Sequence, residues 1–226
     1  MKKENNRSLL KNRDLIKYWD GYYNKNNSNE KNSTFAEYCL PLIKNKSNLL
    51  ELGCGNARDA YFFAKNGINV VALDISGIVI RKNLINTPAD LKEKIKFVNK
   101  DFTLLNQDDS IGLFSSIYSR FTIHTMLKNK IDNVFSFCYD VLLQDGLFLI
   151  ETRSLKDPLF SSGQGNKIAE NTFQYEKGHI RHFISKKDLV DKLTKVGFEL
   201  VEVTESDNLS IVGKDNPVLL RTIAKK

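Results

Sequence analysis

Cysteine is scarce in this 226-residue chain, which contains only Cys39, Cys54 and Cys138. An odd, widely spaced set of three does not form a disulfide framework. Reduced thiols are typical of the cytoplasm, so we expect a cytoplasmic protein. The sequence also lacks CxxC and HExxH patterns. Because such spacings are typical of zinc ligands, their absence predicts no metal site.

Long apolar runs are also missing. No run approaches the roughly 18 residues that a membrane-spanning helix needs. The basic N-terminal stretch has neither the apolar core nor the cleavage site of a secretion signal. We therefore expect no membrane partner. The length and a hydrophobic share of 41% suit one α/β domain with elaborations, as a monomer or a homodimer.

Acidic residues are outnumbered, since 34 Lys and Arg face 27 Asp and Glu, for a net charge of +7. Such an excess can favour an anionic partner. The lysines, however, are interleaved with acidic residues, as in KEKIK at 92–96, and form no long basic stripe. We therefore do not expect a nucleic-acid partner.

Short apolar runs alternate with amphipathic stretches from residue 48 onward. This pattern predicts a doubly wound α/β fold with a mostly parallel sheet. The last two strands are too close for a helical crossover and should form an antiparallel hairpin. The predicted strands are 48–52, 69–73, 95–99, 113–118, 146–152, 198–204 and 217–223, and the predicted helices are 57–66, 77–86, 128–142 and 185–196.

Two regions lie outside this alternation. Residues 1–46 are polar and are predicted to be helical around an Asn/Ser/Lys-rich loop at 24–33. We divide the chain into this N-terminal segment and a domain at 47–226. Residues 153–180 show no period and are predicted to be irregular. We treat about 153–183 as an insertion that covers the substrate.

A glycine turn follows the first strand, in the segment Glu51-Leu-Gly53-Cys54-Gly55-Asn56. Ligands of such sheets bind beyond the carboxyl ends of the strands, and glycine lets the backbone approach them. Arg58 replaces the third glycine of a dinucleotide-binding loop. This argues against a pyrophosphate at the helix N-terminus, and hence against an NAD(P)-dependent reductase.

This segment resembles the E/D-x-G-x-G motif of class I S-adenosylmethionine (SAM)-dependent methyltransferases. The resemblance implies their seven-stranded fold with a terminal antiparallel hairpin, and SAM as the cofactor. It places Glu51 near the methionine ammonium group and the residues of the turn, Gly53, Cys54, Gly55 and Asn56, against the cofactor. Cys54 reads as a small space-filling residue, because sulfonium chemistry needs no covalent intermediate.

Two further acidic residues follow strands. Asp74 ends the second strand, and Asp101 follows the third. Each alone could be a capping or turn residue. The resemblance implies that Asp74 accepts the ribose hydroxyls and that Asp101 meets the adenine amino group. The cofactor residues predicted beside them and at the end of the fourth strand are Ile75, Ser76, Phe102 and Ser119.

Aromatic residues near the N-terminus form the segment Trp19-Asp-Gly-Tyr-Tyr23. It resembles the W-x-x-x-Y segment that covers the cofactor in many class I methyltransferases. The resemblance implies that Tyr23 contacts the cofactor. Packing between helices is the alternative for these rings.

The fourth strand runs into Tyr118-Ser-Arg120-Phe-Thr-Ile-His124. It lacks the N/D-P-P-Y/F motif that holds an extruded base in DNA adenine methyltransferases. Together with Glu151-Thr-Arg153 and the segment 178–183, it resembles bacterial small-molecule methyltransferases of the tellurite-resistance type and those that modify capsule sugars or their phosphoramidate decorations.

Arginine and histidine gather in the loops at the carboxyl edge of the predicted sheet. Arginine suits phosphate or carboxylate, so we expect a small anionic acceptor. The alternative is that some of these arginines form ion pairs with Glu51, Glu151 or Asp157. The candidate substrate-binding residues are Arg120, Arg153, Arg181 and His182.

Histidine is a suitable general base for a neutral hydroxyl acceptor, and His124 and His179 are the candidates. An anionic acceptor would need no base. We favour O-methylation of a capsule or surface-polysaccharide precursor. The alternatives are an RNA or protein methyltransferase, and a SAM-binding protein without catalytic activity.

Overall fold

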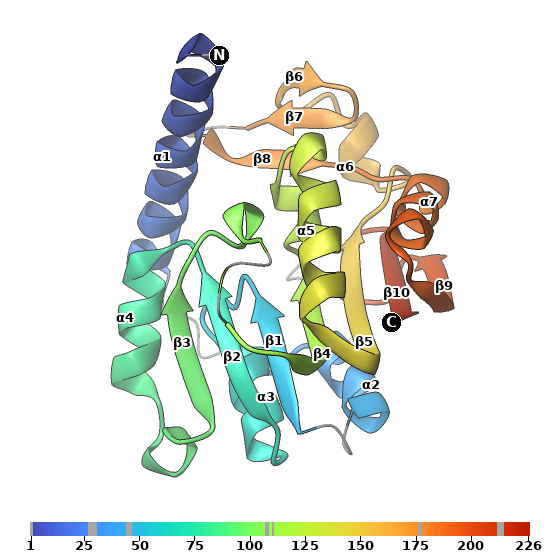
Figure 1. Ribbon diagram of the computed structural model, residues 1–226. Helices are drawn as coiled ribbons and strands as arrows, with labels where there is room; N and C mark the ends of the chain where they lie inside the picture. The colour runs from blue at the N-terminus through green and yellow to red at the C-terminus, as the bar shows by residue number, and fades with distance from the viewer. Residues whose placement is uncertain are drawn as a thin grey trace.

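A seven-stranded sheet forms the centre of the computed structural model, which describes residues 2–26, 31–43, 47–106, 109, 111–175, 178–211 and 215–226. The strand order is β3-β2-β1-β4-β5-β10-β9 (Figure 1). The first five strands of this order run parallel, and β10 pairs antiparallel with both β5 and β9. The strands are β1 (Asn48–Leu52), β2 (Asn69–Asp74), β3 (Ile95–Asn99), β4 (Phe114–Arg120), β5 (Leu142–Arg153), β9 (Glu199–Ser206) and β10 (Leu219–Lys225).

The predicted fold class is therefore confirmed. All seven strands form where the apolar runs predicted them, and the last two make the antiparallel pair. β5 starts at Leu142, directly after a helix and earlier than the predicted residue 146. Its pairing with β4 is irregular in this first part, which explains why the sequence pattern did not reveal it.

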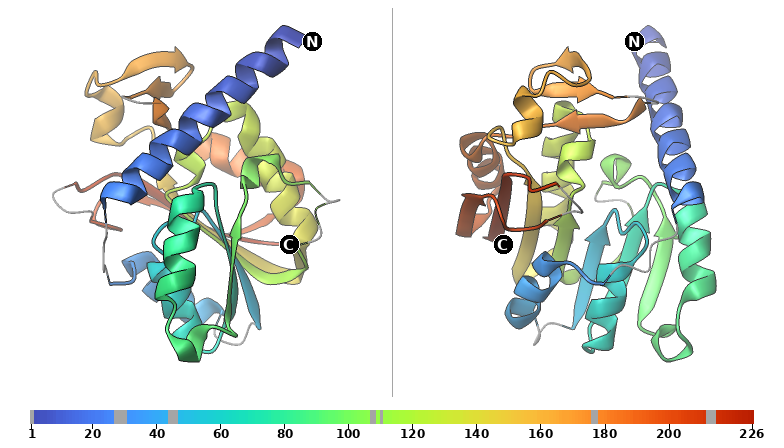
Figure 2. Two further views of the ribbon diagram at one scale, coloured as in Figure 1. Left: turned by 90° about the vertical axis from the view of Figure 1, so that its left-hand side faces the viewer. Right: turned by 180° about the vertical axis from the view of Figure 1, so that it is seen from behind.

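Helices cover both faces of the sheet (Figure 2). One apolar cluster includes Phe135 of α5 and Leu189 of α7, and the other includes Phe35 of α2 and Phe63 of α3. The α-helices are α1 (Lys2–Lys25), α2 (Thr34–Ile43), α3 (Arg58–Lys65), α4 (Gly77–Asn86), α5 (Lys128–Val141), α6 (Pro158–Ser161) and α7 (Lys186–Val196), and the short 3₁₀ turns are η1 (Ala89–Leu91), η2 (Phe102–Leu104) and η3 (Ile123–Thr125).

Local sequence signals explain several helix ends. Ser76 and Ser185 accept hydrogen bonds from backbone N–H groups of the first turns of α4 and α7, which satisfies donors that have no partner within the helix. Gly197 ends α7 in a left-handed conformation that glycine adopts without strain. The predicted loop at 24–33 is shorter than expected, because α1 continues to Lys25, and residues 27–30 lie outside the described part.

The stretch 153–180 is not irregular, which corrects the prediction. It contains a small antiparallel sheet of β6 (Asn166–Ala169), β7 (Thr172–Gln174) and β8 (Ile180–His182). These strands are very short and β6 is exposed along its length, so they show no alternating apolar pattern. The rings of Phe160, Phe173 and Phe183 pack against each other and connect α6 with the small sheet.

The small sheet extends from the carboxyl ends of the central strands, and α1 lies beside it (Figure 2).

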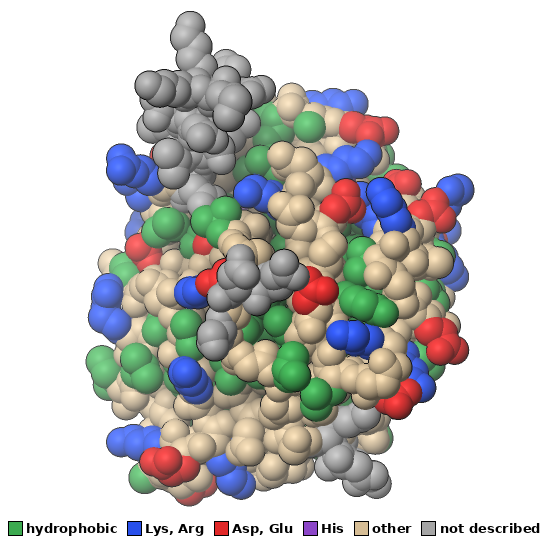
Figure 3. Space-filling view, in the orientation of Figure 1, with side chains coloured by type: hydrophobic (Ala, Val, Ile, Leu, Met, Phe, Trp, Pro, Cys, Tyr) green, Lys and Arg blue, Asp and Glu red, His purple; other side chains and the backbone are tan. Residues whose placement is uncertain are grey.

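Lys, Arg, Asp and Glu side chains are interspersed over the face seen in Figure 3, without a continuous basic stripe. Within the described ranges no helix is long and apolar enough to span a membrane. The same residues contain no cluster of His, Cys, Asp and Glu that could hold a metal ion.

Candidate functional site

A pocket of about 270 Å³ opens at the carboxyl ends of β1, β2 and β4, beneath α1. The sheet order explains its position, since the chain leaves β1 for β2 on one side and β4 lies on the other. Of the predicted cofactor residues, those that line it are Tyr23, Glu51, Gly53, Cys54, Gly55, Asn56, Asp74, Ile75, Asp101 and Phe102.

The glycine turn forms the floor of this pocket. Gly53 and Gly55 have φ angles of +67° and +53°, which side chains other than glycine rarely allow. A Cβ on Gly55 would lie 2.6 Å from the hydroxyl oxygen of Tyr23, and a Cβ on Gly53 would collide with Cγ2 of Thr122. Both glycines are therefore required by backbone conformation and by close neighbours.

Asp74 is held at the end of β2 by the backbone. Its carboxylate accepts hydrogen bonds from the N–H of Gly55 at 2.9 Å and from the N–H of Ser76 at 2.8 Å. Burial raises the pKa of Asp74 to about 6, although these hydrogen bonds oppose the shift. The group therefore titrates just below neutral pH and presents a fixed carboxylate to the pocket above it.

Glu51 is buried at the pocket, and the positive charges of Arg58 and Arg120 only partly offset the cost of its burial. It is 4% exposed, and its Oε2 has no hydrogen-bond partner among the described residues. Burial raises the pKa of Glu51 well above its usual value, and the nearby carboxylates of Asp59 and Asp74 raise it further. An unpaired buried carboxyl group is costly, so the site is complementary to a ligand that brings a positive charge. This fits the ammonium group of the cofactor that the sequence implies.

Asp101 lies in the pocket wall as predicted, whereas two predicted cofactor residues, Ser76 and Ser119, do not. Asp101 lines the pocket, and its Oδ1 also accepts hydrogen bonds from the N–H and the hydroxyl of Thr103. Ser76 and Ser119 are fully buried and do not line it. The hydroxyl of Ser76 caps α4 and donates to Asp20, while that of Ser119 is hydrogen-bonded to Thr122.

The C-terminal half of α1 covers the pocket. Trp19 and Tyr23 stack with ring centroids 5.9 Å apart, and both line the cavity. The helix is attached to α4, since Asp20 accepts a hydrogen bond from Ser76 and Lys82 donates one to the carbonyl of Tyr23 at 2.6 Å. The structure thus places the predicted aromatic segment over the pocket.

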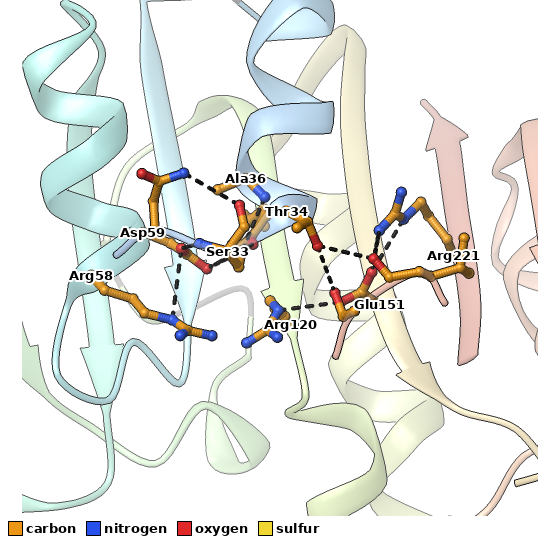
Figure 4. A network of polar contacts seen from close by, with 12 residues as sticks. Ser33, Thr34, Ala36, Arg58, Asp59, Arg120, Glu151 and Arg221 are labelled. Carbon is orange, nitrogen blue, oxygen red and sulfur yellow. Dashed lines mark hydrogen bonds and ion pairs between the residues drawn. The ribbon is translucent and has the colours of Figure 1, made fainter. Parts of the chain in front are cut away.

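Arg120 is the only predicted substrate-binding arginine that lines the pocket among the residues described. Its Nε donates to Glu151 at 3.2 Å, and its guanidinium carbon lies 4.2 Å from the centroid of the Phe121 ring. Glu151 is fully buried and also accepts hydrogen bonds from Arg221 and Ser210 (Figure 4). The ion pair weighed as an alternative is therefore present, and it orients Arg120 at the pocket wall.

The remaining predicted substrate residues lie outside the pocket lining. Arg153 is 5% exposed and is paired with Asp157 and Asp215. Arg181 lies over the ring of Tyr175, with its guanidinium carbon 4.8 Å from the centroid. His182 is buried in the small sheet, where its Nδ1 is 2.8 Å from the hydroxyl of Thr172, and burial lowers its pKa to about 4.

The two candidate general bases are also outside the lining. His124 is buried in η3 and its Nδ1 has no partner among the described residues. Burial lowers the pKa of His124 well below its usual value, and the positive charges of Arg153 and Arg181 lower it further. His179 stacks on Tyr18 at 4.6 Å, and its pKa is lowered to about 4. Imidazoles with such low pKa values are weak bases at neutral pH.

Several pocket residues were not predicted as site residues from the sequence. Arg58 and Asp59 enter the pocket from the first turn of α3. Asp59 accepts hydrogen bonds from the N–H of Ser33 at 2.7 Å and from the hydroxyl of Tyr118 at 2.9 Å, which fixes the start of α2 beside the pocket (Figure 4). No local pattern connects Ser33 with Asp59. Arg58, which was interpreted from the sequence only as the replacement of a third glycine, was the one nearby residue that could have indicated that this turn lines the site.

Phe121 also lines the pocket and has a φ angle of +57°. This conformation is strained for a bulky residue. The N–H of Phe121 donates to the carbonyl of Glu151 at 2.9 Å, which holds the turn at the end of β4. In this conformation the ring of Phe121 contacts both Arg120 and His124.

Comparison with known families gives one match over most of the chain. A family model of a methyltransferase domain matches residues 23–203. An uncharacterized methyltransferase of Schizosaccharomyces pombe is 32% identical over 90 residues, which cover 40% of this chain and 60% of that protein. The alignment therefore spans less than two thirds of the length of this relative.

Solved structures of methyltransferases are similar in fold. A SAM-dependent methyltransferase of Methanosarcina mazei superposes with a TM-score of 0.69 at 20% identity, covering 82% of this chain and 97% of that chain. The 1,6-didemethyltoxoflavin-N1-methyltransferase of Burkholderia thailandensis, solved with S-adenosylhomocysteine bound, gives a TM-score of 0.64 at 17% identity, covering 85% and 76%. A glycopeptide N-methyltransferase gives 0.64 at 18% identity, covering 85% and 95%. These likenesses show the class I methyltransferase fold.

Proposed function

The chain belongs to the methyltransferase-domain family, and from this premise we propose that it transfers the methyl group of SAM to a small anionic acceptor. The observation that carries the proposal is the buried carboxyl group of Glu51, whose Oε2 has no hydrogen-bond partner among the described residues, beside the fixed carboxylate of Asp74. A cationic ligand with a diol satisfies both groups. The pyrophosphate of a dinucleotide would instead bring negative charge next to them.

The pocket residues provide distinct contacts for such a cofactor. We assign the ammonium group to Glu51 and the ribose hydroxyls to Asp74. Ile75 and Phe102 also line the pocket, and their apolar side chains are suited to pack against an adenine ring. Asp101 is assigned to the adenine amino group, and Tyr23 closes the pocket from above.

We infer how the acceptor binds from Arg120, which lies beside Phe121 at the pocket wall. Bound SAM would supply a methyl group activated by the positive sulfur, and S-adenosylhomocysteine would be the leaving group when the acceptor forms a bond to the methyl carbon and the C–S bond breaks. The residues then need mainly to align the acceptor. Arg120 uses Nε to bind Glu151, and no described residue accepts a hydrogen bond from its two Nη groups, so these can bind an anionic group of the acceptor.

An acceptor oxygen that is already anionic requires no proton removal. This agrees with the position of His124 and His179 outside the pocket lining. We therefore favour O-methylation of an anionic group. A phosphoramidate or sugar precursor of a capsule or surface polysaccharide, made in the cytoplasm, is the specific acceptor class that we propose.

Isothermal titration with SAM, S-adenosylhomocysteine, NADH and NADPH tests the cofactor assignment. We expect micromolar binding of the first two alone. Tight binding of NADPH, or none of SAM, would overturn it. Release of S-adenosylhomocysteine in the presence of anionic small molecules would then identify the acceptor.

Cofactor affinity should depend on pH through Asp74. Its pKa of about 6 in the empty protein means that the carboxylate form is lost below this pH. Because we assign hydrogen bonds from both ribose hydroxyls to that form, the dissociation constant of S-adenosylhomocysteine should rise up to about tenfold per pH unit below 6. Titrations at pH 5, 6 and 7.5 measure this. An affinity that is constant over this range would contradict the assignment.

The raised pKa of Asp74 also affects the stability of the empty protein, which should fall as pH rises, whereas the affinity for the cofactor should increase. The folded-state pKa of Asp74 lies above its ordinary value of 3.8, so between these two pH values the empty folded protein binds a proton that the unfolded chain has lost. Its stability should therefore fall as pH rises from about 4 to about 6, by about 3 kcal/mol from this group. Urea unfolding of the empty protein at these pH values tests this, and Asp74→Asn should remove the dependence.

Replacing Arg120 should separate acceptor binding from cofactor binding. We expect Arg120→Gln to raise the KM of the anionic acceptor about tenfold or more, since a charge-assisted pair is lost. The dissociation constant of S-adenosylhomocysteine should stay within about twofold. Glu151 keeps its pair with Arg221, so the fold should tolerate the change.

Arg181→Gln is the matched control, because Arg181 does not line the pocket. It should leave the acceptor KM unchanged. A larger effect at Arg181 than at Arg120 would contradict the assignment of Arg120 to the anionic group beside the transferred methyl group.

A further inference from the structure

A second cavity lies between α1 and the small sheet, with a volume of about 770 Å³. It is an open groove that borders the cofactor pocket, since Tyr22 and Asn26 line both. Tyr22 is 45% exposed at this border. The groove and the pocket in which we place the transferred methyl group therefore adjoin at these two residues.

Gly21 forms part of the wall of this groove and has no structural reason to be glycine. It lies inside α1, its φ angle is not positive, and a Cβ built on it would meet no atom within 4 Å. Glycine in a helix interior costs about 1 kcal/mol relative to alanine. The absence of a side chain at this position keeps the groove open.

The opposite wall approaches the helix closely. Gly178 has a φ angle of +89°, and a Cβ on it would lie 3.3 Å from Cβ of Asp14. This glycine lets the chain next to β8 come up against α1. Two glycines therefore line the groove. Gly178 is required because the chain passes close to α1, and Gly21 leaves the groove unobstructed by a side chain.

The charged groups of the groove are mainly basic. Lys17 and Lys25 are exposed and form no ion pair with any residue that the structure describes, and Asp14 is the only acidic residue in the described lining. Two turns of helix separate the lysines, a rise of about 12 Å. Tyr18 and Tyr22 lie between them in sequence and add aromatic surface.

We propose that this groove binds an anionic extension of the methyl acceptor, carrying phosphate or carboxylate, while the methylated end lies in the pocket beside Arg120. The inference rests on the proposed function. Lysine recognises either anion as a point charge. A groove that adjoins the pocket at Tyr22 and Asn26 and is lined by lysine and tyrosine suits the extension of a ligand whose other end lies in the pocket.

The test uses the full chain saturated with S-adenosylhomocysteine and titrated calorimetrically with inorganic pyrophosphate, or with glutarate as the carboxylate probe. We expect millimolar or tighter binding of at least one, weakened about tenfold by Lys17→Gln combined with Lys25→Gln. Gly21→Phe should block it, because the ring fills the groove. The stronger probe identifies which anion the groove prefers.

Two controls match these changes. Asn24→Phe adds the same ring at an exposed position of α1 that does not line the groove, and Lys65→Gln removes an exposed lysine of α3. Neither should alter binding of the probes. Gly21→Phe should keep the affinity for S-adenosylhomocysteine within about twofold, which also shows that the variant is folded.

The outcomes separate this inference from the proposed function. If the wild-type protein binds S-adenosylhomocysteine but neither probe, or if Gly21→Phe binds the probes as well as wild type, the groove proposal is wrong and the function stands. If wild type does not bind S-adenosylhomocysteine, the proposed function has failed. With an acceptor in hand, Gly21→Phe should raise its KM about tenfold or more.

Discussion

Glu51→Gln should make the empty protein more stable and the cofactor complex weaker. The wild-type carboxyl group is buried, has an oxygen without a partner, and lies near the carboxylates of Asp59 and Asp74. An amide removes the charge at nearly constant shape. We expect the free energy of unfolding at pH 7.5 to rise by about 1–3 kcal/mol. Urea unfolding measures this change.

The pH dependence of this gain has a definite sign. Burial raises the folded-state pKa of Glu51, so the group favours the folded state while protonated and loses that contribution as pH rises. The gain from Glu51→Gln should therefore be small near pH 4 and increase toward neutral pH. Glu93→Gln, at an exposed position, should show no such dependence.

The same substitution should weaken binding of S-adenosylhomocysteine by about 10- to 100-fold, because it removes the charge that we assign to the ammonium group. Opposite effects on stability and on binding are expected of a residue retained for its ligand rather than for the fold. A variant that is less stable and binds the cofactor normally would show that Glu51 has a structural role instead.

Gly53→Ala should abolish most of the cofactor binding and also destabilise the protein. The φ angle of +67° costs a residue with a Cβ about 1–2 kcal/mol. The new methyl group also collides with Cγ2 of Thr122, so the turn or the end of β4 has to move. We expect affinity for S-adenosylhomocysteine to fall by about 100-fold or more, measured calorimetrically, together with a lower melting temperature.

Two variants divide this effect into its causes. Gly67 has a φ angle of +89° and no atom within 4 Å of a built Cβ, so Gly67→Ala measures the backbone cost alone. Thr122→Ser removes Cγ2 and keeps the hydroxyl that is bonded to Ser119. Added to Gly53→Ala, it leaves the Cβ of residue 122 at 3.5 Å and should restore part of the affinity. No recovery would mean that the collision is not the main cause.

The periodicity of the chain predicted the central fold. The strand β2 contains the apolar run 70–73, and α7 is bounded by a capping serine and a terminating glycine. These are local signals of backbone preference and burial. The last two strands were predicted to pair antiparallel from their spacing alone, because a parallel crossover would not fit between them.

The cofactor side of the site could be predicted for a related reason. In a parallel sheet, residues that follow successive strands meet at one edge. Glu51, Asp74 and Asp101 therefore line one pocket although they are far apart in the chain. The hydrogen-bond partners of these residues could not be predicted from the sequence, for example the backbone N–H groups that hold Asp74.

The substrate side was predicted less well, because its charges are balanced by residues far away in sequence. Sequence alone does not distinguish an arginine that binds a ligand from one that is paired. Arg153 forms ion pairs with Asp157, four residues away, and with Asp215 in the loop before β10. Arg120 forms an ion pair with Glu151 of the neighbouring strand. Packing also decides that His179 is stacked on Tyr18 of α1.

The sequence by itself determined the order of strands and helices, the glycine turn and the acidic residues at the strand ends, since each depends on local backbone preference or on the geometry of a parallel sheet. Only the tertiary structure decided which arginine faces the pocket, how β6, β7 and β8 form a second sheet, and where α1 leaves a groove. These features depend on contacts between distant segments, whose energies no local pattern records.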